Sequence, residues 1–227
     1  MGLERHKIER LAEKKDKVHK ISVRDLAWIV AKRGNGATTV AATSFIASMY
    51  NIRVFATGGI GGVHRDGHIT MDVSADLQEM SRNPIAVVCA GAKSILDIGR
   101  TLEYLETMGV AVIGLGTDHF PAFFTRSSGE PVPLRLETPE ECAAMLDWNL
   151  KLETGRGMLI SVPIPSEFEA DGEVVEAATQ QALREATEQK VTGRDITPFI
   201  LKRVAELTKG DSLAASKYYS TQCWLTT

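Results

Sequence analysis

Lys93 is the residue whose type and position most favour covalent chemistry. It follows the apolar run at residues 85–92 and precedes Ser94, which could begin a helix. A lysine at such a strand-to-helix junction would be partly desolvated and would lie near the positive end of the helix. Both effects favour the neutral amine, the form that attacks a carbonyl carbon. A structural or surface-reaching role is the alternative, and position alone does not exclude it.

Two aspartates flank Ser74, which we expect to cap a helix. Asp76 would lie in the first turn, where its simplest role is to complement the helix dipole. Asp72 could instead contact a hard divalent cation, Mg²⁺ or Mn²⁺, mostly through water, since such ions accept one carboxylate beside an anionic substrate.

Other candidates surround the glycine-rich loop at residues 58–62, whose amides could bind an anion. His64 has three alternative roles: a loop histidine whose ring is hydrogen-bonded within the fold, a general acid or base, or a phosphate contact. Thr38 and Thr39 suit phosphate or hydroxyl contacts at a helix start, and capping is their alternative role. Lys20 precedes a capping-box pattern and could be a solvated surface charge.

Missing glycines argue against two nucleotide-binding motifs. The loop at residues 58–62 lacks the third glycine of a dinucleotide fingerprint, and His64 and Arg65 stand where its helix should begin. Lys93 does not belong to a P-loop, because Ala86 occupies the position of the upstream glycine.

The composition is that of an ordinary globular protein, with 227 residues, 44% hydrophobic and 24% charged. The net charge of −3 gives no support for a nucleic-acid or polybasic membrane surface, and no apolar run could span a bilayer. Cys89 lies in an apolar run and reads as a buried thiol, so we expect a reducing, cytoplasmic location. An organelle would be the alternative if a start segment were missing.

Apolar runs alternate with helical patterns along the chain. Strands are predicted at residues 52–57, 85–91, 111–115, 122–125 and 157–162. Helices are predicted at residues 22–30, 37–50, 94–108, 138–152, 173–189 and 197–208, with a turn at 34–36. This alternation predicts a single α/β/α-layered domain with a mostly parallel central sheet.

Several blocks in fixed order resemble the pseudouridine-5′-phosphate glycosidase family, also called indigoidine synthase A-like. They are HKISVRDL (19–26), NGATTVA (35–41), VFATGGIGGVHR (54–65), MDVSADLQE (71–79), CAGAKSILD (89–97) and TLEYLET (101–107). The resemblance covers almost the whole chain, and long ordered blocks are more specific than any single motif.

This resemblance implies reversible cleavage of the C–C glycosidic bond of pseudouridine 5′-phosphate to uracil and ribose 5-phosphate. It implies a Schiff base on Lys93, one Mn²⁺ at Asp72, a homotrimer and a functional link to a pseudouridine kinase. His64 and Asp76 match active-site positions, where we expect proton handling or sugar-hydroxyl contacts. The predicted substrate contacts are Lys20, Thr39, Val40, Ser74, Ala75 and Asp76.

The chain departs from the family pattern at both ends. We expect a family domain over residues 1–216, incomplete at its N-terminus, and a divergent tail over 217–227. The family's N-terminal glutamate, the expected acid for ring opening, has no counterpart, and Ser216 stands where an active-site asparagine belongs. These departures predict reduced or absent turnover by this chain alone. The alternative is a non-catalytic isoform that binds sugar phosphate or co-assembles with full-length subunits.

Overall fold

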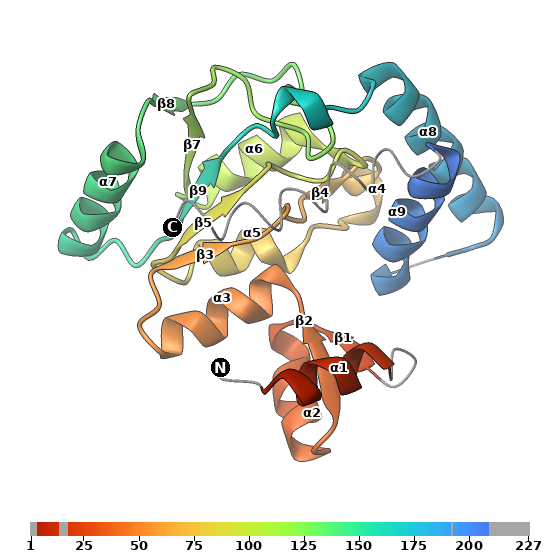
Figure 1. Cartoon of the computed structure of the whole chain (residues 1–227), viewed down its shortest axis with the longest axis horizontal. Helices are drawn as coiled ribbons and strands as arrows, with labels where there is room; N and C mark the ends of the chain where they lie inside the picture. The colour runs from red at the N-terminus through yellow and green to blue at the C-terminus, as the bar shows by residue number, and fades with distance from the viewer. Residues whose placement is uncertain (1–3, 14–17, 192, 209–227) are drawn as a thin grey trace.

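A computed structural model describes residues 4–13, 18–191 and 193–208 of the chain. Within these ranges a five-stranded sheet forms the centre of the molecule, in the order β3-β5-β9-β7-β8 (Figure 1). Its strands are β3 (Val54–Ala56), β5 (Ala86–Cys89), β7 (Ala111–Leu115), β8 (Leu134–Leu136) and β9 (Met158–Ser161). All four pairings are parallel, which confirms the predicted sheet type.

The parallel arrangement brings the carboxyl ends of the strands to one edge of the sheet. The glycine-rich loop at residues 58–62 follows β3, and Lys93 follows its neighbour β5. Their backbones then pair directly, because Ile60 N–H donates to Gly91 O at 3.0 Å and Lys93 N–H to Ile60 O at 3.2 Å. Ligands of open α/β sheets bind at this edge.

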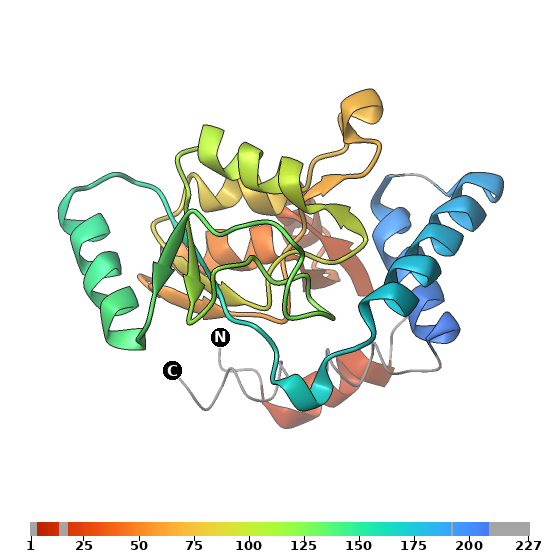
Figure 2. The same ribbon diagram turned by 90° about the horizontal axis from the view of Figure 1, so that it is seen from above.

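Side chains that alternate along the strands bury the two faces of the sheet separately. Val87 and Leu159 belong to the larger core, while Ala86 and Met158 belong to a smaller one that includes Cys142. The smaller core is covered by α7 (Pro139–Lys151). The larger is covered by α3 (Val40–Met49), α5 (Ala75–Met80), α6 (Ile98–Thr107), α8 (Gly172–Glu188) and α9 (Ile196–Leu207). Helices therefore lie on both sides of the sheet (Figure 2), as the alternation predicts.

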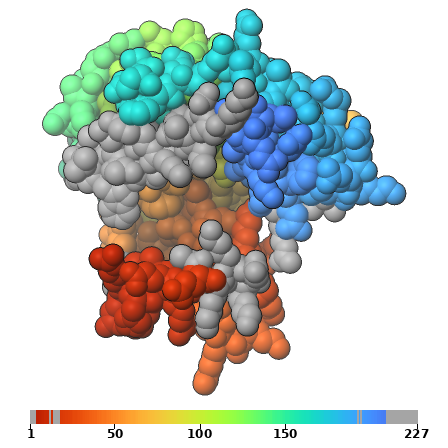
Figure 3. Space-filling view, turned by 45° about the vertical axis from the view of Figure 1, so that its right-hand side comes forward, coloured from red at the N-terminus to blue at the C-terminus, as the bar shows by residue number. Residues whose placement is uncertain are grey.

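An N-terminal unit projects from this layered body (Figure 3). Its strands β1 (Val18–Ile21) and β2 (Asn35–Thr38) pair in parallel and carry Lys20 toward the body. Its helical segments are α1 (Arg5–Glu13), η2 (Val23–Asp25) and α2 (Leu26–Ala31), and the predicted capping box of Ser22 and Asp25 is present.

At the other end of the chain, α8 and α9 pack against each other beside the sheet (Figure 1). Short elements complete the path: β4 (Val63–His64), α4 (Gly67–Thr70), β6 (Leu96–Asp97), η3 (Ser166–Phe168) and η4 (Gly193–Asp195). In the part of the chain that the structure describes, no helix has the length and apolar character needed to cross a membrane.

The predicted helix at residues 94–108 begins four residues later than expected, at Ile98. Residues 96 and 97 instead form β6, which pairs antiparallel with β4. Asp97 caps α6 by accepting from Arg100 N–H at 3.0 Å. Lys93 therefore does not lie at the positive end of a helix, and that part of its predicted activation is wrong.

Two further local predictions are wrong. Residues 122–125 form bends with one isolated bridge at Ala122, because Phe123 adopts a left-handed φ of 66° that no strand accommodates. The predicted turn at residues 34–36 leads directly into β2, and the following helix begins at Val40 rather than Ala37. Pairing with β1 is the tertiary contact that extends this segment.

A pair of substitutions tests where α6 begins. Asp97→Ala removes the helix cap and should lower the free energy of unfolding by about 1 kcal/mol. Ser94→Ala should change it by less than about 0.5 kcal/mol, because the buried Ser94 Oγ has no hydrogen-bond partner among the described residues. Urea denaturation measures both, and a larger loss at Ser94 would contradict this boundary.

Candidate functional site

A cavity of about 1010 Å³ opens at the carboxyl edge of the sheet, between β3, β5, α3, α5 and the N-terminal unit. The residues predicted from the sequence as site residues all line it. They are Lys20, Thr39, Val40, His64, Asp72, Ser74, Ala75, Asp76 and Lys93. Segments as far apart as β1 and the β5–β6 connection therefore contribute to one site.

Lys93 reaches this cavity from the end of β5 and is largely buried. Burial is the main cause that lowers the pKa of its amine, and the nearby Lys20 lowers it further. The Asp76 carboxylate acts in the opposite direction. Desolvation, rather than a helix dipole, thus makes the neutral amine of Lys93 more accessible.

Asp76 is a buried carboxylate whose two oxygens each accept a backbone hydrogen bond. Oδ1 accepts from Ala41 N–H and Oδ2 from Gly61 N–H, both at 2.8 Å. Asp76 is only 5% exposed. Ser74 caps α5 by accepting from Asp76 N–H at 3.2 Å. A Cβ on Gly61 would lie 2.2 Å from Ser74 Oγ, so this contact requires glycine. The geometry favours a positioning role for Asp76 over the predicted proton handling.

His64 and Asp72 face each other across the base of a loop, with Nε2 and Oδ2 3.8 Å apart. The backbone fixes the pair, because His64 N–H donates to Asp72 O at 3.0 Å. Burial lowers the pKa of His64, while the Asp72 carboxylate raises it and the lysines Lys20 and Lys93 lower it. This environment favours a neutral imidazole, which can accept or donate a proton.

The predicted substrate contacts come from helix starts and from β1. Thr39 caps α3, with its hydroxyl accepting from Ala42 N–H at 3.4 Å, and Val40 is the first residue of that helix. Ala75 is the first residue of α5. Lys20 approaches the cavity from the N-terminal unit. Helix N-termini and a lysine together favour an anionic group such as phosphate.

Asp72 is the candidate metal ligand. Among the described residues, no cluster of three or more histidine, cysteine, aspartate or glutamate side chains could enclose a metal ion. A cation here would have one protein carboxylate and would take its remaining ligands from water and substrate. Mg²⁺ and Mn²⁺ accept such a set.

Phe123 is a cavity residue that the sequence did not identify. It lies in the loop after β7, in the stretch predicted as a strand, and no residue-type signal marks it. Thr57, Arg82 and Thr197 also line the cavity without having been predicted. Ser216 and the tail at residues 217–227 lie outside the described residues.

A parallel α/β sheet with a desolvated lysine and two helix N-termini at its carboxyl edge is the arrangement of an α/β protein that binds a small molecule at this edge. Comparison with known proteins gives the family. The model of the family described as "Indigoidine synthase A like protein" matches residues 1–220, so the chain belongs to this family.

Curated relatives in this comparison are named pseudouridine-5′-phosphate glycosidase. That from Arabidopsis thaliana is 55% identical over 95% of this chain and 66% of its own length. That from Escherichia coli is 49% identical over 95% of this chain and 69% of its own length. The chain thus spans about two thirds of the length of these relatives.

Two solved structures share the fold. The prealnumycin C-glycosynthase AlnA, in complex with ribulose 5-phosphate, has a TM-score of 0.88 at 38% identity, over 96% of this chain and 72% of its own. An indigoidine synthase A-like protein from Thermotoga maritima has a TM-score of 0.86 at 36% identity, over 95% of this chain and 70% of its own.

Replacing Asp76 with asparagine tests its structural role. Asp76→Asn places an amide group opposite a backbone N–H and should lower the free energy of unfolding by about 2 kcal/mol. Asp72→Asn is the matched control and should change it by less than about 0.5 kcal/mol, because Asp72 makes only a loose, partly exposed ion pair. Equal losses in urea denaturation would refute the distinction.

Proposed function

We propose that this chain cleaves the C–C glycosidic bond of pseudouridine 5′-phosphate reversibly, giving uracil and ribose 5-phosphate. The observation that carries the proposal is the desolvated Lys93 in a cavity whose other walls suit a sugar phosphate. The names of the curated relatives support the same reaction, as does the ribulose 5-phosphate complex of a structural neighbour.

The substrate explains why a lysine is needed. A C-glycoside has no oxygen leaving group for the acid of an ordinary glycosidase to protonate. As the ring opens, the C1′–O4′ bond breaks and the Lys93 nitrogen bonds to C1′. The nitrogen then loses a proton, and O4′ takes one up. The nitrogen lone pair then forms the C=N bond while the bond to uracil breaks, and the uracil carbon takes up a proton. Water hydrolyses the iminium and releases ribose 5-phosphate and the amine.

The remaining cavity residues would bind and orient the substrate. Lys20 and the N-terminus of α3, with Thr39 and Val40, suit the phosphate. His64, favoured as a neutral imidazole, would move a proton or contact a sugar hydroxyl. Asp76 would hold Ala41 and Gly61 in place.

We further propose that Asp72 holds one divalent cation, Mn²⁺, which would supply positive charge beside the anionic substrate. The expected result for Asp72→Asn is a loss of Mn²⁺ affinity of about tenfold or more, measured by calorimetry with and without ribose 5-phosphate. Unchanged affinity in the folded variant would exclude Asp72 as the ligand.

The proposed assembly is a homotrimer, which rests on the family resemblance. Apolar side chains exposed beside the edge strand β3, namely Met49, Tyr50, Ile52 and Val54, are compatible with a contact between subunits. Sedimentation equilibrium of the chain measures the mass of this assembly directly.

A kinase that phosphorylates pseudouridine would supply the substrate. A reducing cytoplasm would suit the buried thiols of Cys89 and Cys142.

Reduction by borohydride tests the central step. With ribose 5-phosphate and Mn²⁺ present, wild-type protein should gain one reduced sugar-phosphate adduct on Lys93, identified by peptide mass spectrometry. Because the pKa of Lys93 is lowered, adduct formation should begin at a lower pH than for an ordinary lysine, and it should fall as acid protonates the amine.

Lys93→Met is the control and should form no adduct while remaining folded. Absence of an adduct on folded wild-type protein would overturn the proposal and favour a non-catalytic role in sugar-phosphate binding.

A further inference from the structure

Phe123 has a backbone conformation that a bulky side chain rarely adopts. Its φ is 66°, in the left-handed region, where glycine and asparagine are the usual residues. The surrounding loop enforces this conformation, because Phe123 N–H donates to Ala90 O at 2.9 Å and Phe124 N–H to Ala122 O at 2.7 Å. Strained residues of this kind persist where the structure holds a side chain in one place, often at a functional site.

The strained backbone aims the Phe123 ring at the glycine-rich loop. A Cβ on Gly59 would lie 2.4 Å from the Cδ2 atom of the ring, and one on Gly58 would lie 3.5 Å from Cε2. The absence of a side chain at Gly59 therefore lets the ring pack directly against the backbone of the loop, whereas a Cβ at Gly58 would make an ordinary contact. Phe123 is only 8% exposed, yet it lines the cavity together with Lys93.

Most of the other residues that line the cavity have polar or charged side chains, and Val73 and Leu96 are among the apolar ones. Among the described residues that line it, Phe123 provides the only phenyl ring. The backbone N–H of Phe123 donates to the carbonyl of Ala90, three residues before Lys93. This hydrogen bond fixes the Phe123 backbone next to the turn that carries the lysine.

We propose that Phe123 is a positioning residue that keeps water away from the Lys93 amine. This inference rests on the proposed function, since a dry amine matters for attack on a carbon centre. The charged and titratable groups that face Lys93 come from four elements: Asp76 on α5, Lys20 on β1, Cys89 on β5 and His64 on β4. Desolvation outweighs each of these charges as the cause of the lowered pKa of Lys93.

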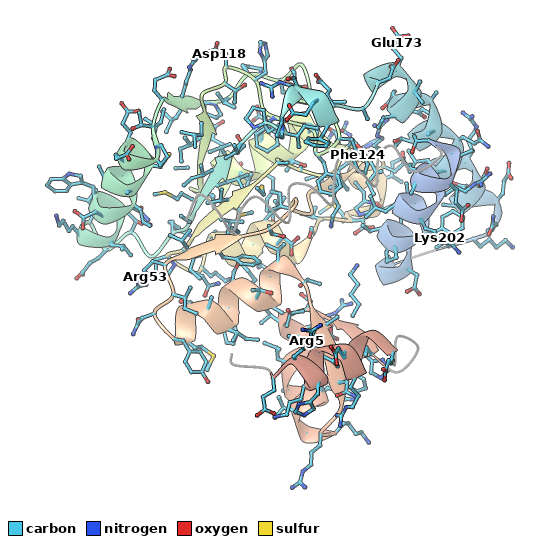
Figure 4. All side chains as sticks on the ribbon, viewed as in Figure 1. Arg5, Arg53, Asp118, Phe124, Glu173 and Lys202 are labelled. Atoms are coloured by element: carbon cyan, nitrogen blue, oxygen red, sulfur yellow. The ribbon has the colours of Figure 1, made fainter. Side chains whose placement is uncertain are left out.

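The adjacent Phe124 supplies a matched control. Its ring contacts that of Phe123 edge to face, with centroids 4.6 Å apart, but does not line the cavity. It lies toward the α8–α9 side of the molecule (Figure 4), where its carbonyl accepts from Ala170 N–H at 3.0 Å. Both rings are buried to a similar degree.

The test is the pH dependence with which an amine-reactive reagent, 1-fluoro-2,4-dinitrobenzene, labels Lys93 in the full chain. Peptide mass spectrometry gives the midpoint of the titration, which is insensitive to a uniform change in access. Phe123→Asn admits water and should move the midpoint up by about one pH unit. Phe123→Leu, which stays apolar, should move it less, and Phe124→Leu should leave it in place.

A purely structural role for Phe123 predicts the opposite order. Asparagine tolerates a left-handed φ better than leucine, so Phe123→Leu would then perturb the site more than Phe123→Asn. That order, or an unchanged midpoint in a folded Phe123→Asn variant, would overturn the inference. If Phe123→Asn does not fold, Phe123→Gly replaces it, since glycine adopts the left-handed φ and removes the ring, and an unchanged midpoint in that variant has the same meaning.

The labelling needs no substrate, so it is separable from the proposed function. A missing ribose 5-phosphate adduct with a shifted midpoint would refute the reaction alone. An adduct with an unshifted midpoint would refute only the role of Phe123.

Discussion

The candidate site depends on one buried carboxylate. Asp76 joins the first turn of α3 to the glycine-rich loop through two hydrogen bonds of 2.8 Å, while Ser74 fixes its own helix start. Hydrogen bonds to an ionised acceptor are stronger than those between neutral groups, and burial increases the cost of leaving any of these partners unpaired. The positions of Thr39 and Val40 relative to Lys93 follow from this junction.

Both basic and acidic side chains line the cavity around that junction. Lys20 and Lys93 approach the same space, and each lowers the pKa of His64. The Asp76 carboxylate, which accepts two backbone hydrogen bonds, raises the pKa of Lys93, but burial still lowers that pKa overall. An anionic ligand beside Lys20 would offset the charge of these two lysines. The position of Lys20 is thus compatible with a phosphorylated ligand.

Prediction from the sequence was most accurate for features that depend on residues close together in the chain. The cap at Ser74 was predicted because a hydroxyl before a helix start accepts a hydrogen bond from its own backbone neighbours. The alternation of strand and helix patterns predicted the parallel sheet, because helices that connect successive strands allow those strands to run parallel. The grouping of Lys93 with Asp72, Asp76 and His64 came from the family resemblance, and the structure places these residues around one cavity.

The sequence failed where distant segments decide the local conformation. Residues 94–97 have a helix-like pattern, yet pairing of β6 with β4 extends the chain there. The stretch around Phe123 has the composition of a strand, but contacts with Ala90 and the glycine-rich loop impose a left-handed turn. Neither contact is visible in a window of neighbouring residues, and tertiary packing overrides the local preference.

The strand order also constrains how the chain can fold while it is being synthesised. Strand β9 lies between β5 and β7, although it follows both in the sequence. On the ribosome, β5 and β7 therefore emerge well before the strand that separates them, and their facing edges have no partner until residue 161 has left the exit tunnel. Such non-local pairing slows folding and leaves strand edges open to other chains. The sheet that carries Lys93 is thus completed only after β9 has emerged, and until then the open strand edges would benefit from chaperone protection.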